Sequence, residues 1–159
     1  MQRGTEPNKG MWSMPGGKIE IGEGTLDAAK RELWEETGLT TSQQNNSYNL
    51  KWHNDGPFAC SDSIHQQKQS SKSKDDDGLL SSNNIVFHYV ISQCFAEIIY
   101  SSISTQPPII KASDDAMDAK FWNTNDIQKF EDEGSVTKGV TKILERSELL
   151  YSNGLLQCH

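Results

Sequence analysis

Apolar residues recur at three- and four-residue intervals between Leu26 and Thr37, the spacing of an amphipathic helix. They fall on one stripe, which should face the core: Leu26, Ala29 and Leu33. Thr25 precedes the stripe as a candidate N-cap, and Gly38 follows it where many helices place a left-handed residue. The pattern therefore predicts a helix from Leu26 to Thr37 that ends at Gly38.

Strands are predicted where apolar residues alternate with polar ones, or run together, between turn-forming residues. This pattern occurs within 14–23 and over 50–53, 58–64, 85–100 and 119–122. The apolar stretch 85–100 is expected to form one long strand or two in the centre of the sheet, with His88 packed there rather than acting as a ligand. Two later helices are expected, 126–131 capped by Thr124 or Asn125, and 137–151.

Residues 66–84 interrupt these elements with a low-complexity tract rich in Ser, Lys and Asp. Such a composition buries too little apolar surface to order itself, so a disordered hairpin insertion is expected. The length of 159 residues suits a single domain with a sizeable core, spanning 1–159. The succession of strands and helices predicts an α/β protein, with a mixed β-sheet between helices in an α/β/α sandwich.

Charge and cysteine content narrow the range of functions. The formal net charge of −7 argues against binding nucleic acid or anionic membranes through bulk charge. A nucleotide substrate remains compatible with it, because a bound divalent cation supplies local positive charge. The three cysteines are widely spaced and are expected to be reduced thiols, which favours the cytoplasm. No apolar run reaches membrane-spanning length, so no membrane association is expected.

Three carboxylates cluster near the end of the first predicted helix, at Glu32, Glu35 and Glu36. Their spacing places them on one helix face, where the negative end of the helix dipole disfavours each by about 0.3–1 kcal/mol. Arg31 is placed to pair with Glu35, but one arginine does not neutralise three acids. A divalent cation such as Mg²⁺, which prefers oxygen ligands, fits this cluster. The alternative is an ordinary solvated acidic face.

The glycine-rich loop before the helix favours the cation site over the solvated acidic face. Glycines let backbone groups approach an ion or a phosphate closely. Loop and helix together have a fixed set of residues at fixed spacing: Gly17, Glu23, Arg31, Glu32, Glu35, Glu36 and Gly38, with apolar Leu33 and Leu39. This set resembles the Nudix box, and the chain resembles a Nudix hydrolase.

The resemblance implies an enzyme that hydrolyses the pyrophosphate bond of a nucleoside diphosphate linked to another moiety. Its substrate would be a small-molecule nucleotide and its cofactor Mg²⁺ or Mn²⁺. The implied metal ligands are the Gly16 carbonyl, Glu32, Glu35 and Glu36, with Glu36 the strongest candidate.

Catalytic roles are implied for Glu32, Glu35 and Arg31. Glu32 is a candidate base, and Arg31 is expected to hold Glu35 in place rather than touch the substrate. Some family members take the base from a later loop, where Asp115 or its neighbour Asp114 is the candidate. Glu23 is expected to brace the loop against the helix.

Weaker matches outside the box lean toward the ADP-ribose pyrophosphatase-like branch of the family, over residues 3–12, 87–91 and 114–122. The family's first strand has no counterpart before Met1, so lower stability and self-association through an exposed sheet edge, as a homodimer, are expected. Two alternatives to an active hydrolase stay open: a non-catalytic nucleotide-binding or regulatory Nudix-fold module, and an inactive truncated fragment.

Overall fold

The computed structural model describes residues 1–41, 48–53, 56–66, 85–101 and 107–158. Within them the chain is α/β, as predicted. The strands are β1 (Gln2–Arg3), β2 (Tyr48–Trp52), β3 (Ala59–Gln66), β4 (Ile85–Gln93), β5 (Ala96–Tyr100) and β6 (Ala116–Asp118). The helices are α1 (Thr25–Thr37), α2 (Thr124–Asp132) and α3 (Val140–Ser152).

The strands form three separate antiparallel pairs, β1–β6, β2–β5 and β3–β4. The predicted single mixed sheet is therefore not found among the described residues, where the one parallel contact is an isolated bridge between Trp12 and Val136. The apolar stretch 85–100 forms two strands, which was one of the two expected alternatives. The break between them is at Cys94 and Phe95. Because β4 pairs only with β3 in this part of the chain, its expected central position is wrong.

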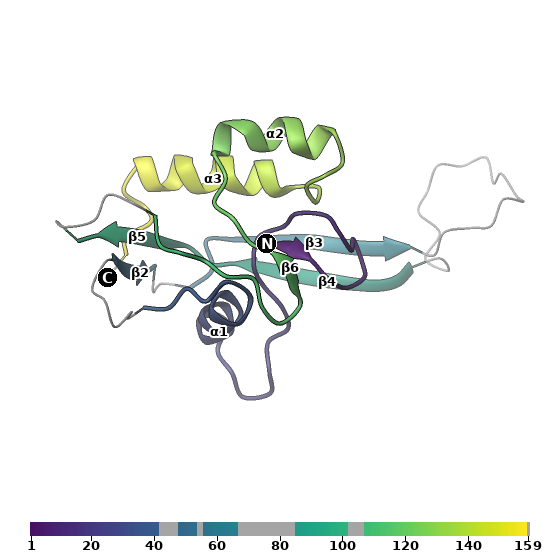
Figure 1. The fold of residues 1–159 in the computed structure, drawn as a ribbon, viewed down its shortest axis with the longest axis horizontal. Coiled ribbons are helices and arrows are strands. Elements are labelled where there is room, and N and C mark those ends of the chain that lie inside the picture. The colour runs from purple at the N-terminus through teal and green to yellow at the C-terminus, as the bar shows by residue number, and fades with distance from the viewer. Residues whose placement is uncertain (42–47, 54–55, 67–84, 102–106, 159) are drawn as a thin grey trace, which may run out of the picture.

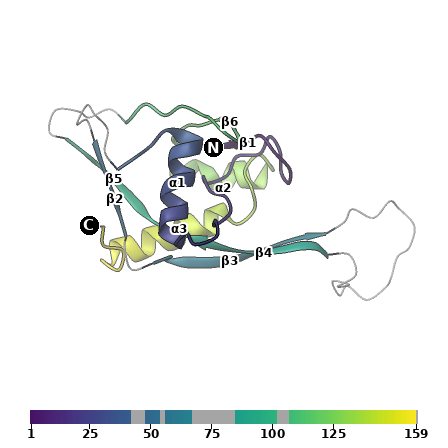
Figure 2. The same ribbon diagram turned by 90° about the horizontal axis from the view of Figure 1, so that it is seen from below.

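Helices lie on both sides of the strands. Figure 1 shows α2 and α3 together above them and α1 below. The β3–β4 hairpin extends away from the helices in both views (Figures 1 and 2). This placement explains why β4 has exposed apolar side chains, with Val90 70% exposed. His88 is also exposed, and its Nε2 lies 2.7 Å from Asp62 Oδ1, so the expectation that it packs in the sheet is wrong.

Helix α1 matches its prediction closely at the C-terminal end. Gly38 has φ of 74°, and its N–H donates to the Trp34 carbonyl over 2.8 Å, the left-handed ending that glycine favours. At the other end Gly24, rather than Thr25, is the N-cap residue, and it has no side chain with which to cap the helix. Thr25 forms the first helical position instead.

The apolar stripe of α1 packs against the β2–β5 pair, as its spacing predicted. The buried residues of this cluster are Leu39, Tyr48, Leu50 and Trp52. The partly buried residues packed on them include Leu26, Ala29 and Leu33 from α1, with Ala96 and Ile98 from β5. Burial of this kind stabilises a fold by about 25 cal/mol per Å² of apolar surface, so this cluster fixes α1 to the strands.

A second cluster joins α2 and α3 around buried Ile127, Val136 and Val140. Trp12 and Trp122 pack against it, and Lys120 Nζ lies 4.5 Å and 3.9 Å from their ring centroids. The two predicted later helices are confirmed, with shifted ends. The cap of α2 is Asn123, not the expected Thr124 or Asn125; its side chain accepts a hydrogen bond from the Asn125 N–H.

Three further expectations differ from the structure or lie outside it. No strand forms within 14–23, where the apolar side chains of Ile19 and Ile21 are exposed instead of packed. The strand expected over 119–122 is found slightly earlier, as β6, because β6 pairs with β1. The insertion expected over 66–84 lies outside the described residues except for Gln66, which ends β3. None of the described helices is long and apolar enough to cross a membrane.

Candidate functional site

Arg31 is the centre of the charged network on α1. Its guanidinium contacts Glu23 through Nε and Nη2, each 2.9 Å from a carboxylate oxygen, and donates from Nη1 to Glu32 and Glu35 at 2.8 and 3.0 Å. Nη2 also donates to the Lys18 carbonyl. Arg31 thus pairs with Glu35 and ties the loop to the helix, and Glu23 braces that loop, which are the arrangements expected from the sequence.

These contacts stabilise the charged forms of both partners. The hydrogen bond from Arg31 lowers the pKa of the Glu23 carboxyl, and a backbone hydrogen bond at Glu20 lowers it further. Glu23 in turn raises the pKa of the Arg31 guanidinium, with Glu32 adding to the effect. Arg31 is therefore permanently charged and Glu23 is ionised throughout the neutral range.

Glu36 lies apart from this network and is only 2% exposed. Its Oε2 accepts a hydrogen bond of 2.8 Å from the Gly16 N–H. Burial raises the pKa of Glu36 to about 7, and the charge of Glu32 acts in the same direction, while the Gly16 hydrogen bond opposes them. The positive charges of the Met1 amino group and Arg3 also oppose the rise but do not cancel it. A cation bound at Glu36 would lower its pKa further.

Gly17 passes close to the side chain of Glu32 on α1. A Cβ atom at position 17 would lie 2.2 Å from the nearer carboxylate oxygen of Glu32. Because that oxygen accepts the hydrogen bond from Arg31, a larger residue at position 17 would push the Glu32 carboxylate away from Arg31.

A later loop is hydrogen-bonded to the end of α1. The N–H groups of Lys111 and Ser113 donate to the Thr37 and Glu36 carbonyls over 3.0 and 3.4 Å, and the Ser113 hydroxyl donates to the Glu35 carbonyl. These carbonyls are among the last four of the helix, which have no partner within it. The loop satisfies them and is positioned by them.

This attachment brings the acidic pair of the later loop to the carboxylate helix, although Asp114 and Asp115 differ in position. Asp114 has a positive φ of 53° and lines a hollow with Glu35. Asp115 is exposed, and its carbonyl accepts a hydrogen bond from Gly4 N–H at 2.8 Å, which ties the loop to the start of the chain. Of the two candidates, Asp114 is the one that shares a surface with Glu35.

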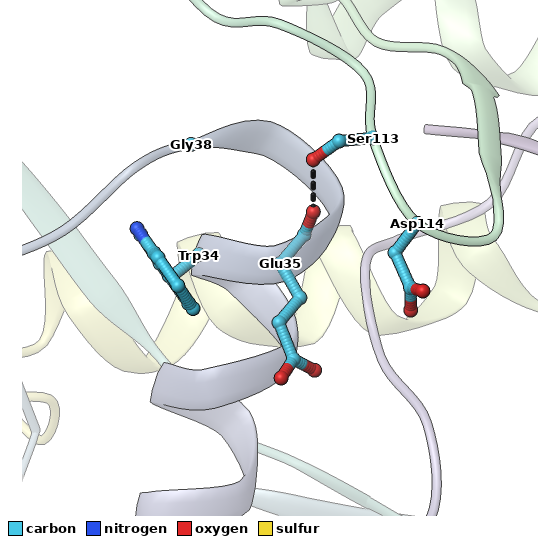
Figure 3. A pocket seen from close by; sticks show the side chains of 5 residues that line it. All are labelled: Trp34, Glu35, Gly38, Ser113 and Asp114. Atoms are coloured by element: carbon cyan, nitrogen blue, oxygen red, sulfur yellow. Dashed lines mark hydrogen bonds between the residues drawn. The ribbon is translucent and has the colours of Figure 1, made fainter.

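The hollow has a volume of about 390 Å³ and lies at the C-terminal end of α1. Figure 3 shows its five lining residues, with Trp34 and Asp114 on opposite sides of Glu35 and the Ser113 hydroxyl above. Sequence reasoning missed Trp34 and Ser113. An exposed aromatic on the polar side of the predicted helix was the available signal for Trp34, whereas the role of Ser113 depends on a contact 78 residues away.

Comparison with models of known protein families identifies the family of this chain. The family model described as NUDIX domain matches residues 1–94, more than half of the chain. The chain belongs to the Nudix family.

Curated relatives match over a short segment. Over 36 residues the chain is 47% identical to phosphatase NudJ of Escherichia coli strain K12, and equally to the proteins of that name in Escherichia coli O157:H7 and Shigella flexneri. The match covers 23% of this chain and 24% of each relative, so the similarity is partial and distant. No solved structure matches this chain significantly.

Nudix proteins typically use a divalent metal, and the donor chemistry of this site fits one. Buried Glu36, with Glu32 and Glu35 on the same helix, offers the oxygen ligands that Mg²⁺ and Mn²⁺ take. Their side chains are not gathered around one point, however. Among the described residues, no three His, Cys, Asp or Glu side chains are close enough together to hold an ion. Glu32 and Glu35 are instead turned to Arg31.

Proposed function

We propose that the chain is a divalent-metal-dependent hydrolase of the pyrophosphate bond in a nucleoside diphosphate linked to another moiety, such as ADP-ribose. The observation that carries the proposal is the loop-and-helix unit: Arg31 joins Glu23 to Glu32 and Glu35, while Glu36 is buried against Gly16. Four carboxylates in one short unit are costly in a merely structural role. They suit a site that recruits a cation and the phosphates it accompanies.

The proposed ligands are Glu36, Glu32, Glu35 and the Gly16 carbonyl. A bound Mg²⁺ or Mn²⁺ offsets phosphate charge and lowers the pKa of a bound water. Arg31 orients Glu35 and Glu32 through the hydrogen bonds already described, and on this proposal it makes no contact with substrate.

The base that removes a proton from the attacking water is proposed to be either Glu32 of the helix or one of the two loop aspartates, Asp115 or Asp114. Glu32 is placed on the helix itself, and its oxygens accept a hydrogen bond from Arg31 at 2.8 Å. Asp115 and Asp114 belong to the loop that Ser113 attaches to the helix. Replacing each by Asn or Gln and comparing kcat separates the base from its neighbours, because loss of the base affects kcat more than KM.

The test is chromatographic detection of the hydrolysis products, such as AMP and ribose 5-phosphate from ADP-ribose, for a panel of ADP-ribose, NADH, nucleotide sugars, oxidised deoxynucleoside triphosphates and capped RNA, with Mg²⁺, Mn²⁺ or EDTA. We expect turnover of at least one substrate with metal and none in EDTA. Glu36→Gln should abolish turnover, whereas Glu148→Gln, an exposed glutamate of α3, should not. Full turnover in EDTA would overturn the metal assignment.

A second candidate is a nucleotide-binding module without turnover. It is favoured by the observation that Arg31 occupies the carboxylates of Glu32 and Glu35, leaving no converged metal site among the described residues. Nucleotide binding without hydrolysis of any panel member, in protein shown to be folded, would support this module. An inactive fragment would show neither binding nor hydrolysis.

A further inference from the structure

Trp34 is a large apolar side chain left 56% exposed on the helix that carries the carboxylates. It lines the same hollow as Glu35, one of the proposed metal ligands. Leaving such a side chain in water forgoes part of the stabilisation that burial of a large apolar group contributes. Burial against another molecule recovers it, and the hollow beside Trp34 provides the space.

The hollow is open on one side and bounded by a loop on the other. Gly38 has no side chain, and a Cβ atom built there would meet nothing within 4 Å, so the rim at Gly38 is unobstructed. The opposite wall is the Ser113–Asp114 loop, held to the helix by the Ser113 hydroxyl and backbone N–H. The hollow is therefore formed before any ligand is bound.

The charge of the lining residues limits which ligands can bind in the hollow. Of the residues that the structure describes, those that line the hollow include two carboxylates, Glu35 and Asp114, and no basic side chain. A phosphate group placed there without a metal would be repelled. A flat ring stacks favourably on an indole, and its N–H groups are suitable donors to a carboxylate such as Asp114.

We propose that this hollow binds the base of the nucleotide substrate, stacked on Trp34 with its N–H donors toward Asp114. The inference rests on the proposed function, since it names the site for one part of that substrate. Glu35 belongs both to the hollow and to the Arg31 network. A base held at Trp34 thus places the attached phosphates beside the carboxylates of α1.

The test is calorimetric titration in Mg²⁺ with ligands that share a phosphate and differ in the base: AMP, GMP, CMP, UMP and ribose 5-phosphate. We expect wild type to bind at least one of the four nucleotides more tightly than ribose 5-phosphate. Trp34→Ala should weaken that nucleotide about tenfold, the usual scale for loss of one stacking contact, and leave ribose 5-phosphate unchanged. Trp34→Phe should retain most of the affinity, because its ring still stacks.

Phe121→Ala, which removes an exposed aromatic outside the hollow, is the matched control and should bind as wild type does. The inference is overturned if no nucleotide binds better than ribose 5-phosphate, or if Trp34→Phe and Trp34→Ala both bind the nucleotide like wild type. It is also overturned if Trp34→Ala only changes the oligomeric state in gel filtration, since Trp34 would then contact a second copy.

These outcomes are separate from failure of the proposed function. If wild type hydrolyses ADP-ribose and Trp34→Ala does so with the same KM, the hydrolase stands and the base site does not. If binding depends on Trp34 but no substrate is turned over, the base site stands and the hydrolase does not.

Discussion

Arg31 holds Glu23 with two hydrogen bonds of equal length, 2.9 Å from Nε and 2.9 Å from Nη2. This forked contact joins the loop before α1 to the middle of the helix. The planar guanidinium matches a carboxylate in a way that the point charge of lysine does not. Together with the hydrogen bond from Gly16 to Glu36, the pair holds the loop against the helix that carries the carboxylates.

Arg31→Lys should therefore impair turnover although the charge is kept. Lysine cannot bind Glu23 with two parallel hydrogen bonds and reach Glu32 and Glu35 at the same time. We expect kcat/KM to fall about 100-fold, the effect of misplacing a site by roughly 1 Å. Steady-state kinetics checks this, with Arg146→Lys on the exposed face of α3 as the matched control. Unchanged kinetics in Arg31→Lys would show that the fork is dispensable.

Glu36→Gln should separate catalysis from stability. Glutamine keeps the size of the side chain and an oxygen to accept the Gly16 N–H, but removes a charge that burial disfavours. Without metal at neutral pH we expect a melting temperature equal to or above that of wild type. With Mg²⁺ we expect turnover to be lost. A large drop in melting temperature without metal would mean that the charge of Glu36 is needed for folding.

Glu131 gives a prediction for acid pH. Its carboxylate accepts hydrogen bonds from the Gly139 and Thr141 N–H groups, 2.6 and 2.8 Å long, and so ties the end of α2 to the start of α3. Burial opposes ionisation of Glu131, but these hydrogen bonds outweigh it and hold its pKa below the usual 4.5. The stabilisation is complete above the unfolded-state pKa and is lost as the pH falls through the lower, folded-state pKa.

Glu131→Gln should therefore destabilise the protein by about 1 kcal/mol at pH 7, the usual value of a helix cap. The difference from wild type should shrink as the pH falls below about 4. Urea titrations at several pH values measure it, with Glu133→Gln as a nearby exposed control. A difference that is the same at pH 7 and pH 3 would contradict the assignment of the effect to the Glu131 charge.

Residues 67–84 should be replaceable by a two-residue turn. Gln66 at the end of β3 pairs with Ile85 at the start of β4, so the two strand ends are neighbours. A short Asn-Gly turn joins such ends in an antiparallel hairpin. We expect urea midpoint and turnover to match those of the full chain. Loss of either would assign the replaced segment a function that its composition does not indicate.

Self-association is expected through β4. Within the described residues β4 pairs only with β3, and Val86, Val90 and Ile91 are exposed along it. A free, apolar strand edge is a template for pairing with a second copy, which would form the expected homodimer. Val90→Lys should shift the protein toward monomer in light scattering, whereas Leu155→Lys, an exposed leucine outside the strand, should not. An unchanged mass for both variants would exclude this edge.

Local patterns predicted the helix of the candidate site well and its surroundings poorly. The spacing of Leu26 and Leu33 and the glycine at 38 are short-range signals, and α1 follows them almost to the residue. The position of β6 was predicted wrongly, because it is set by pairing with β1 more than 100 residues earlier. The same holds for Ser113. No residue pattern near Ser113 indicates its hydrogen bond to the Glu35 carbonyl.

The approach of Gly17 to Glu32 links the shape of the loop to the charges on the helix. A Cβ atom built at position 17 would lie 2.2 Å from a carboxylate oxygen of Glu32, and the same oxygen accepts the hydrogen bond from Arg31. Since that oxygen ends a flexible side chain, a larger residue at position 17 displaces the carboxylate and leaves the backbone in place. A change of size in the loop is thereby converted into a change in the ion pairs of α1.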